Sequence, residues 1–337
     1  MIKKTSTRFG IIEVPKSHIL SRSIGNLQIS SYAQETMCRF GQSVVFDEAS
    51  SLINSLVDCN FNAKQIERVC HLYGGLLDEK NIESIESGES KIYSESEKQE
   101  LHYAMIDGAM YPTKSKDEPW KEMKLGRLFK NSDLLPFSEK RNFITKSIYV
   151  AHLGEAKDFF PKFEHEIESL KNLVFINDGG TWIWKWIENS FPNSVQILDF
   201  YHAKEHLCEF AKEYFQEEEQ RKKWIENQTE IMLNKNPEEL IEAIKSLDYQ
   251  KKTEQSKAKL INYYTTHLKR MQYKIFKEKG LLIGSGAIES AHRVYQQRFK
   301  LSGQHWTKKG LQETIQLKSA YKSNLWNKVI QIAKNAA

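Results

Sequence analysis

Three acidic residues in this sequence have the setting that a metal-dependent nuclease requires. Asp107 and Asp178 each follow a short apolar run and precede glycine, a pattern typical of a buried strand that delivers a carboxylate at its C-terminal end. Glu289 instead opens a predicted helix, after Gly284-Ser285-Gly286. Three converging carboxylates can bind hard cations such as Mg²⁺ or Mn²⁺, and two such ions can clamp a phosphodiester during in-line displacement. The pattern therefore predicts that Asp107, Asp178 and Glu289 are metal ligands in the cleavage and joining of DNA.

Each acid also has an ordinary interpretation. An Asp before Gly is usually a turn residue, and a Glu in the first turn of a helix usually interacts with the helix dipole. Those interpretations do not explain why the three acids fall on the first strand, the fourth strand and a late helix of one predicted domain. Taken together, the acids favour a catalytic site.

A zinc peptidase is the competing interpretation. The segment His202-Ala203-Lys204-Glu205-His206 matches the H-x-x-E-H pattern, with two histidines at the spacing of one helical turn. That chemistry needs both histidines on a helix and a distant third ligand. We place His202 at a strand end after Asp199, which disfavours the zinc interpretation.

The elements that would position the acids have a recognisable order. Strands are predicted at 101–112, 120–130, 147–153, 172–178 and 195–201, with helices at 155–170 and 181–191. This order is typical of an α/β fold with a ribonuclease H-like mixed sheet, in which the first and fourth strands are neighbours. The first part of this core spans 101–202, an all-helical insertion spans 203–280, and 281–337 completes the core with the Glu289 helix and a basic segment.

A small, mostly helical DNA-binding region is predicted at 1–77, before an acidic, flexible linker at 78–100. Asn62-Ala63-Lys64-Gln65 has the spacing of a capping box that starts a helix. A helix, a short link and a second helix form a helix-turn-helix pattern, although an ordinary helical hairpin has the same pattern. If the pattern binds DNA, Lys64, Gln65 and Arg68 lie where a recognition helix contacts base edges.

The C-terminal part is strongly basic. From Lys269 onward, 14 Lys and Arg residues stand against three Glu residues, an excess of +11, while the whole chain has a net charge of +5. Aromatic residues interleave with these charges, a mixture that suits phosphate neutralisation and base stacking, although a solvated helical face has the same composition. Five residues are predicted to contact DNA phosphates: Arg293, Arg298, Lys300, Lys308 and Lys309.

Composition bounds these interpretations. The chain has 337 residues with 40% hydrophobic content, enough for one large core or several small ones. No apolar run approaches the roughly 20 residues of a membrane helix, and the N-terminus lacks the apolar stretch of a secretory signal. The four cysteines form no C-x-x-C pair and are expected to be reduced. We therefore expect a cytoplasmic protein without a membrane partner.

Several motifs, in order, resemble one enzyme family. They are Asp107-Gly108, Trp120-Lys121-Glu122-Met123-Lys124-Leu125-Gly126, Asn177-Asp178-Gly179, Leu198-Asp199-Phe200-Tyr201-His202 and Gly284-Ser285-Gly286-Ala287-Ile288-Glu289-Ser290. Together they look like bacterial insertion-sequence DDE transposases of the Mutator-related group, closest to the ISKra type. The resemblance covers about residues 100–310. Related enzymes often carry cysteine pairs in a longer N-terminal region, and their lack here indicates a shortened recognition region or a truncated copy.

The resemblance implies roles for residues and partners. Asp107, Asp178 and Glu289 match the metal ligands of that group, and the helical insertion separates the second acid from the third. Asp199 and His202 match its Asp-x-x-His element, which implies an auxiliary catalytic role. The implied partners are double-stranded transposon ends and target DNA, a homodimer or larger assembly, and a nucleoid-associated location in a bacterium. An inactive or domesticated transposase that regulates DNA is the alternative within the same fold.

Overall fold

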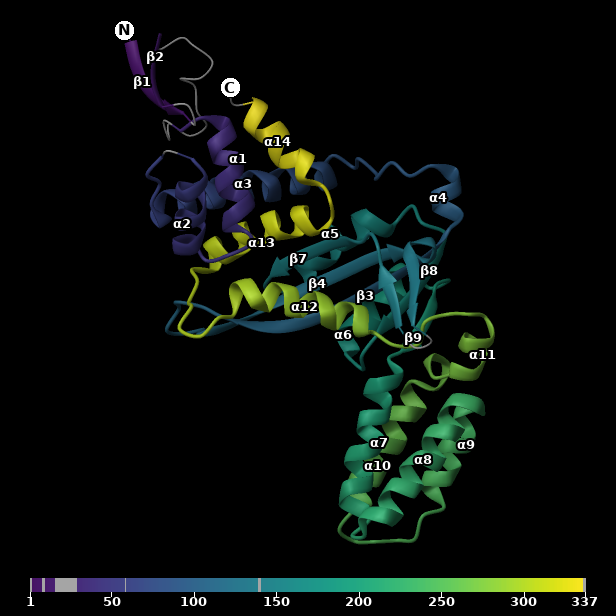
Figure 1. The fold of residues 1–337 in the computed structure, drawn as a ribbon. Helices are drawn as coiled ribbons and strands as arrows, with labels where there is room; N and C mark the ends of the chain where they lie inside the picture. Colours follow the sequence, from purple (N-terminus) through teal and green to yellow (C-terminus); the bar gives the residue numbers. More distant parts are fainter. Residues whose placement is uncertain (1, 8–9, 16–28, 58, 139–140, 336–337) are drawn as a thin grey trace. The chain divides into compact units, whose positions relative to one another are not determined.

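The structure, a computed structural model, describes all residues except 1, 8–9, 16–28, 58, 139–140 and 336–337. It has two compact units (Figure 1). Unit 1 comprises Met1–Glu100, Gly108–Lys171 and Ser290–Ala337, and unit 2 comprises Leu101–Asp107 and Asn172–Glu289. The boundaries cross strand β3 (Leu101–Pro112) and helix α12 (Gly286–Phe299), so each of these elements contributes to both units.

Unit 1 begins with a hairpin and three helices. Strands β1 (Ile2–Thr7) and β2 (Gly10–Pro15) are antiparallel, and helices α1 (Ser31–Gly41), α2 (Phe46–Leu56) and α3 (Ala63–Glu86) follow. The predicted capping box starts α3, because the Asn62 side chain accepts from the Gln65 amide and the Gln65 side chain accepts from the Asn62 amide. The predicted helix, link and helix are therefore present.

Residues 78–100 differ from the flexible linker that their composition predicts. Helix α3 extends nine residues into this segment, and a short helix α4 (Glu95–Gln99) ends it. The Asp78 carboxylate accepts from Lys162 Nζ at 2.6 Å, in a pair that is largely buried. The correction has a physical reason: acidic residues in this segment have basic partners elsewhere in unit 1, which composition alone does not reveal.

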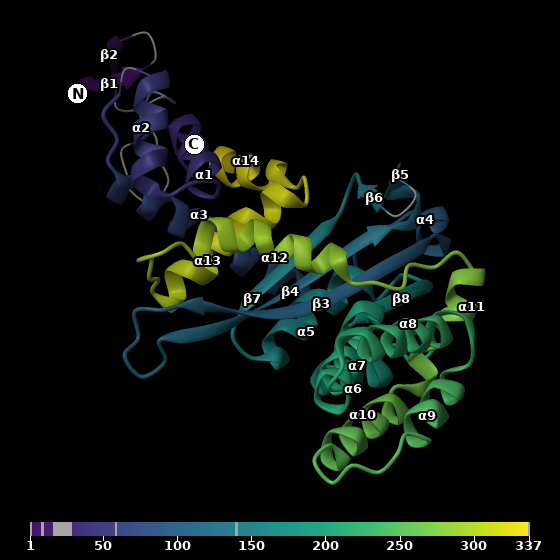
Figure 2. The same ribbon diagram turned by 60° about the horizontal axis from the view of Figure 1, so that its bottom comes forward.

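Helices from the C-terminal part complete the core of unit 1. Helix α13 (Lys308–Lys322) packs on α3, and α14 (Trp326–Asn335) packs on α1 (Figure 2). A Cβ atom on Gly74 of α3 would lie 1.9 Å from the Glu313 carbonyl oxygen, so α3 and α13 approach as closely as glycine allows. The buried residues that these helices share include Met37, Cys38, Ile66, Val69, Tyr73, Leu317, Val329 and Ile332.

Unit 1 also holds two antiparallel strand pairs and helix α5. Strands β4 (Trp120–Lys130) and β7 (Ile148–Leu153) pair antiparallel, and α5 (Ala156–Ile167) packs against both. Strands β5 (Leu134–Ser138) and β6 (Arg141–Ile144) form a separate hairpin that was not predicted.

Unit 2 holds the parallel strands and the helix between them. The first part of β3 pairs with β8 (Asn172–Asn177), and β8 pairs with β9 (Val195–Leu198), all parallel. Helix α6 (Thr181–Ser190) connects β8 to β9. The order of the five-stranded sheet is β7-β4-β3-β8-β9. This confirms a mixed α/β sheet in which the first and fourth predicted core strands are neighbours.

The segment predicted as an all-helical insertion is helical. Its helices are α7 (Phe200–Tyr214), α8 (Glu218–Asn234), α9 (Pro237–Lys245), α10 (Glu254–Thr266), a short turn at Leu268–Arg270, and α11 (Tyr273–Glu278). Figures 1 and 2 show α7, α8, α9 and α10 side by side. The first of them begins at Phe200, earlier than predicted, because Asp199 caps it. In the described part of the chain, no helix is both long and apolar enough to cross a bilayer.

Candidate active site

Two of the predicted metal ligands belong to adjacent parallel strands of unit 2 or to the residue that directly follows one of them. Leu101 pairs with Asn172 and Ala104 with Phe175, a constant offset of 71 positions. Continued three residues beyond the last pair, the same offset would set Asp107 level with Asp178, the residue that follows β8. One residue earlier in each segment, the Ile106 amide donates to Asn177 Oδ1 at 2.6 Å. Asp178 thus follows the end of its strand as predicted, whereas Asp107 lies within β3, which continues to Pro112, and not at the C-terminal end that the sequence predicts.

The turn that carries Asp178 is fixed on several sides. The Asp178 carboxylate accepts from the Gly180 amide at 2.9 Å, and its carbonyl accepts from Trp184 Nε1 at 2.7 Å. A Cβ atom on Gly179 would lie 2.6 Å from the Tyr263 ring, so the ring of α10 packs directly on this turn. Asp178 itself is partly exposed. The backbone is thus held while the carboxylate retains access to solvent.

Asp199 follows β9 as Asp178 follows β8, but its carboxylate is buried, with 1% exposure. One carboxylate oxygen accepts from the His202 amide at 2.9 Å and caps α7. The other accepts from the Ser285 amide at 2.6 Å and from the Ser285 hydroxyl. Asp199 therefore fastens the loop that leads to Glu289. The structure supports a positioning role, which differs from the auxiliary chemical role that the resemblance implies.

Glu289 lies in the first turn of α12 and is exposed. Its neighbours Ile288 and Ala291 are buried, as are Tyr295 and Phe299 farther along the predicted apolar stripe. The Ile288 amide donates to the Ser285 carbonyl at 2.9 Å, so the helix starts at the residue that Asp199 holds. This geometry keeps the Glu289 side chain on the solvent side of the helix.

The three acids supply oxygen donors of the type that Mg²⁺ and Mn²⁺ prefer. The continued strand register would set Asp107 and Asp178 at one level, as two ligands of one ion require. Within the described residues, however, no three His, Cys, Asp or Glu side chains already form a group that could hold a metal. The donors fit such an ion in their chemistry.

His202 and His206 both lie on α7, which corrects the prediction that His202 ends a strand. The physical reason is the Asp199 cap, which starts the helix before His202. The two rings are 4.8 Å apart between centroids, and the His206 ring is 4.5 Å from that of Tyr263. Burial, and then the nearby His202, lower the pKa of His206. The zinc motif has its helix, but over the described ranges no third ligand completes a site.

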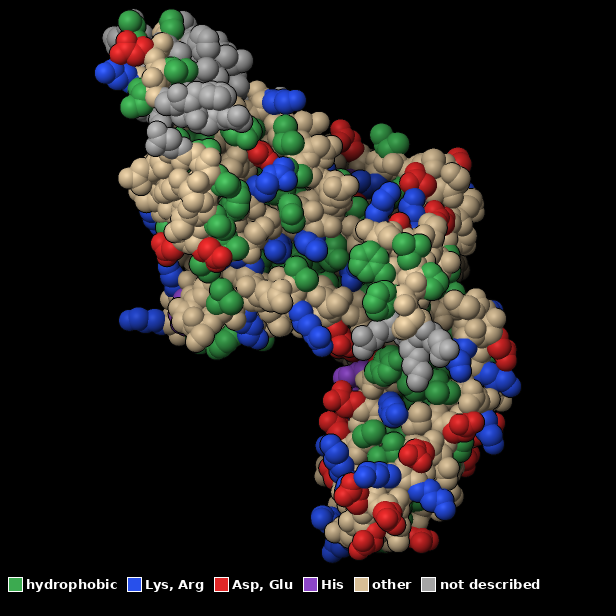
Figure 3. Space-filling view, in the orientation of Figure 1, with side chains coloured by type: hydrophobic (Ala, Val, Ile, Leu, Met, Phe, Trp, Pro, Cys, Tyr) green, Lys and Arg blue, Asp and Glu red, His purple; other side chains and the backbone are tan. Residues whose placement is uncertain are grey.

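The eight residues predicted to contact DNA all lie in unit 1. Six of them are exposed: Lys64, Arg68, Arg293, Lys300, Lys308 and Lys309. Figure 3 shows that the helices of the insertion carry side chains of both charges intermixed. Lys308 pairs with Glu118, and Lys309 lies 3.7 Å from Glu313. The side chain of Gln65 closes the capping box of α3, so it is held at the helix start.

Arg298 does not contact solvent, so its predicted phosphate contact is wrong. Its exposure is 1%, and its Nε donates to the Gly41 carbonyl at 2.9 Å. The guanidinium lies over the rings of Phe46, Phe299 and Trp306. Burial lowers its pKa to about 10. The sequence held a signal, because Arg298 is seven residues from Ala291 and shares its buried helical stripe.

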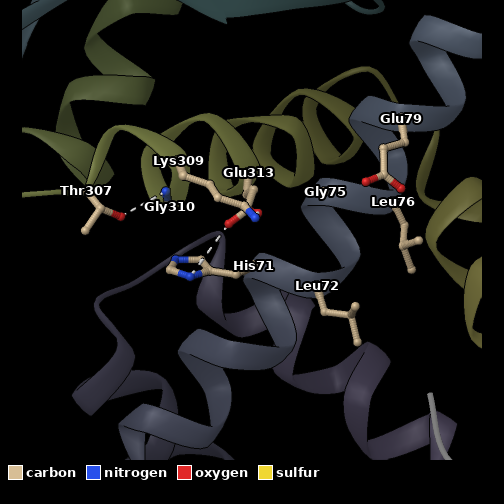
Figure 4. A pocket seen from close by; sticks show the side chains of 9 residues that line it. All are labelled: His71, Leu72, Gly75, Leu76, Glu79, Thr307, Lys309, Gly310 and Glu313. Atoms are coloured by element: carbon tan, nitrogen blue, oxygen red, sulfur yellow. Dashed lines mark hydrogen bonds and ion pairs between the residues drawn. The ribbon is translucent and has the colours of Figure 1, made fainter. Parts of the chain in front are cut away.

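A pocket of about 460 Å³ lies in unit 1 between α3 and the start of α13 (Figure 4). Thr307 caps α13 by accepting from the Gly310 amide at 3.0 Å. His71 Nδ1 and Lys309 Nζ each lie 3.7 Å from the Glu313 carboxylate, whose pKa is raised by burial. The acids of the candidate active site belong to unit 2, so this pocket contains none of them.

The candidate site also contains residues that the sequence did not reveal. Ser285, Trp184 and Tyr263 hold the loop before α12 and the turn after β8. Ser285 stood in a motif noted only for its glycines. Trp184 and Tyr263 have no local signal, because their roles depend on contacts between distant segments.

Comparison with known proteins gives one family and two more distant likenesses. A family described as "Uncharacterised protein family (UPF0236)" matches residues 132–335, which is more than half of the chain. A curated relative from Streptococcus gallolyticus, "UPF0236 protein in vanSb 3'region", is 24% identical over 262 residues, which cover 72% of this chain and 54% of the relative. The chain thus spans about half the length of that relative.

Among solved structures, the "Drosophila P element transposase strand transfer complex" is similar with a TM-score of 0.46 and 9% sequence identity. The match covers 88% of this chain and 93% of the other. A TM-score of this size does not establish a shared fold.

Proposed function

The chain belongs to the uncharacterised protein family UPF0236, and we propose that it is a DNA transposase that cleaves and transfers strands at the ends of an insertion sequence. The observation that supports this proposal is the parallel register of β3 and β8, which, continued three residues, would set Asp107 level with Asp178. Glu289 follows a loop that is fastened to the next strand end by Asp199. The motif resemblance to Mutator-related transposases, with the ISKra type as the expected branch, points to the same chemistry.

In this proposal Asp107, Asp178 and Glu289 hold Mg²⁺ or Mn²⁺. Such ions, when held there, would supply Lewis-acid chemistry for the attacking and leaving oxygens of the phosphodiester. The protein itself would position the three carboxylates. The β3 and β8 strands would position Asp107 and Asp178, and the loop at Ser285 would position Glu289. His202, exposed in part on the first turn of α7, is proposed to contact the phosphate.

The fold and the partners are proposed on the same basis. A mixed sheet with parallel β3, β8 and β9 beside antiparallel β4 and β7 agrees with a ribonuclease H-like core interrupted by the insertion. Double-stranded DNA is the proposed partner of the exposed cations in unit 1. Bringing two element ends together requires two sites, which favours a homodimer or larger assembly.

The test is cleavage of DNA that carries the inverted repeats flanking the gene. With Mg²⁺ or Mn²⁺ present, the protein should nick these ends and leave a free 3′-hydroxyl, and EDTA should abolish the product. Retained, repeat-specific DNA binding without any cleavage would instead support the inactive regulator. Hydrolysis of peptides with Zn²⁺, lost in Glu205→Gln, would support the zinc peptidase.

A further inference from the structure

Tyr263, a side chain of the helical insertion, packs against the turn that carries Asp178. It lies on α10, in unit 2 with all three acids. A Cβ atom on Gly179 would lie 2.6 Å from its ring and 2.8 Å from its hydroxyl oxygen. The hydroxyl therefore lies beside the residue that directly follows Asp178.

The Tyr263 hydroxyl is buried and has no hydrogen-bond partner among the residues that the structure describes. The neighbouring Tyr264 shows the usual arrangement, because its buried hydroxyl donates to the Ala203 carbonyl at 2.9 Å. A buried hydroxyl without a partner costs stability unless a bound group supplies the missing contact. The Tyr263 hydroxyl can therefore donate to an acceptor on a bound molecule.

The surroundings indicate which acceptor the hydroxyl suits. The rings of His206 and His267 flank the Tyr263 ring at 4.5 and 4.9 Å, which holds it in one orientation. Burial raises the pKa of Tyr263, and the negative charges of Asp178 and Asp199 raise it further. A tyrosine hydroxyl is protonated at neutral pH, so it can donate to an acceptor oxygen that enters beside Gly179.

We propose that Tyr263 is a catalytic residue of the transposase site, and that its hydroxyl donates to a nonbridging oxygen of the phosphodiester under attack. This inference rests on the proposed function, because it assigns the substrate oxygen to the same site. The ring packs on Gly179 and positions the turn of Asp178, while the hydroxyl supplies the substrate contact. The insertion would then complete the active site as well as separate two acids in the sequence.

The experiment compares Tyr263→Phe with two control variants in single-turnover cleavage of end-containing DNA with Mg²⁺. Removing a donor to a charged oxygen should lower the cleavage rate about 10- to 100-fold. DNA affinity in Ca²⁺ and the thermal midpoint should stay at the wild-type values, because the hydroxyl has no partner to lose. Tyr264→Phe should lower the thermal midpoint and keep the rate, and Tyr249→Phe, exposed by 72%, should change neither.

Stereopure phosphorothioate at the cleaved position identifies the oxygen. One diastereomer should slow the wild type, and Tyr263→Phe should add little further loss on that diastereomer, since sulfur accepts hydrogen bonds weakly. A wild-type rate for Tyr263→Phe, in a protein whose wild type cleaves, overturns this inference and leaves the proposed function standing. Absence of cleavage by the wild type overturns both.

Discussion

The Asp199 carboxylate holds both the amide and the hydroxyl of Ser285, four residues before Glu289. The same carboxylate caps α7 through the His202 amide, so one buried group joins the end of β9, the start of the insertion and the start of α12. Because Glu289 is itself exposed, its position depends on how firmly this loop is held. The Asp199 and Ser285 contact is thus the structural link between the strand edge and the third acid.

Replacing Asp199 should weaken both the fold and catalysis. Asp199→Ala leaves the Ser285 and His202 amides without their acceptor, so we expect a loss of about 2–4 kcal/mol in the free energy of unfolding. Urea denaturation measures this loss, and single-turnover cleavage should fall in parallel. Asp248→Ala, at an exposed aspartate of the insertion, should stay within about 0.5 kcal/mol of the wild type. A fully stable Asp199→Ala protein would refute the assigned positioning role.

Two arginines on α12 should separate stability from DNA binding. Arg298→Ala removes a buried guanidinium that packs on three aromatic rings, so we expect a loss of about 2–4 kcal/mol in stability. The slope of DNA affinity against salt should not change. Arg293→Ala, at an exposed position, should keep its stability and reduce that slope. Chemical denaturation measures the stability of each variant, and fluorescence anisotropy on the same samples measures the salt slope. A stable Arg298→Ala protein with a reduced slope would contradict the burial of Arg298.

The exposed cations of unit 1 should act through phosphate charge. If Lys300, Lys308 and Lys309 each contact a phosphate of duplex DNA, removing one contact should lower the log–log salt slope by about 0.9. The loss should be equal for end-containing and random duplexes. Arg68→Ala should instead reduce the difference between those duplexes, because the start of α3 is the proposed base-reading surface. Titrations at several salt concentrations measure both effects, and an unchanged slope would mark these lysines as solvated surface.

His152 should make stability depend on pH. Burial, and then the charge of Lys162, lower its pKa to about 4 in the folded protein, whereas an unfolded histidine titrates near about 6.5. The unfolded chain therefore binds a proton that the folded chain rejects, so this contribution is present above about pH 6.5 and is lost as the pH falls toward 4. His152→Gln should reduce the rise of unfolding free energy between pH 4 and 6.5. Exposed His305→Gln is the control, and equal slopes in both variants would exclude the effect.

Much of the fold follows from local patterns. The bounds predicted for β3 and β4 agree with the structure, because the polar segments after Pro112 and after Lys130 are strong local signals of a strand end. The capping box at Asn62 and the helical insertion were also predicted from local sequence patterns. The length of α3 was not predicted, because the acidic stretch that begins at Asp78 has partners in distant segments, such as Lys162. Composition predicts exposure, and it cannot predict such pairs.

The sequence predicted the acids of the candidate site, but it did not predict the residues that position them. Asp107 and Asp178 carried sequence signals because each ends an apolar run before glycine. Tyr263 and Ser285 act through contacts across the fold, with Gly179 and with Asp199, that no local spacing encodes. Arg298 shows the opposite limit: its charge predicted a surface role, while its place on the apolar stripe of α12 had already assigned it to the interior.

The most direct measurement is the cleavage rate of Asp178→Asn on end-containing DNA with Mg²⁺, beside Asp248→Asn as the matched control. The substitution keeps the size of the side chain and removes the charge that an ion requires, so cleavage should fall by about 1,000-fold or more. DNA binding in Ca²⁺ and the thermal midpoint should match the wild type, and the control should cleave normally. Near-normal cleavage by Asp178→Asn would contradict the account, because it would remove this carboxylate from the chemistry.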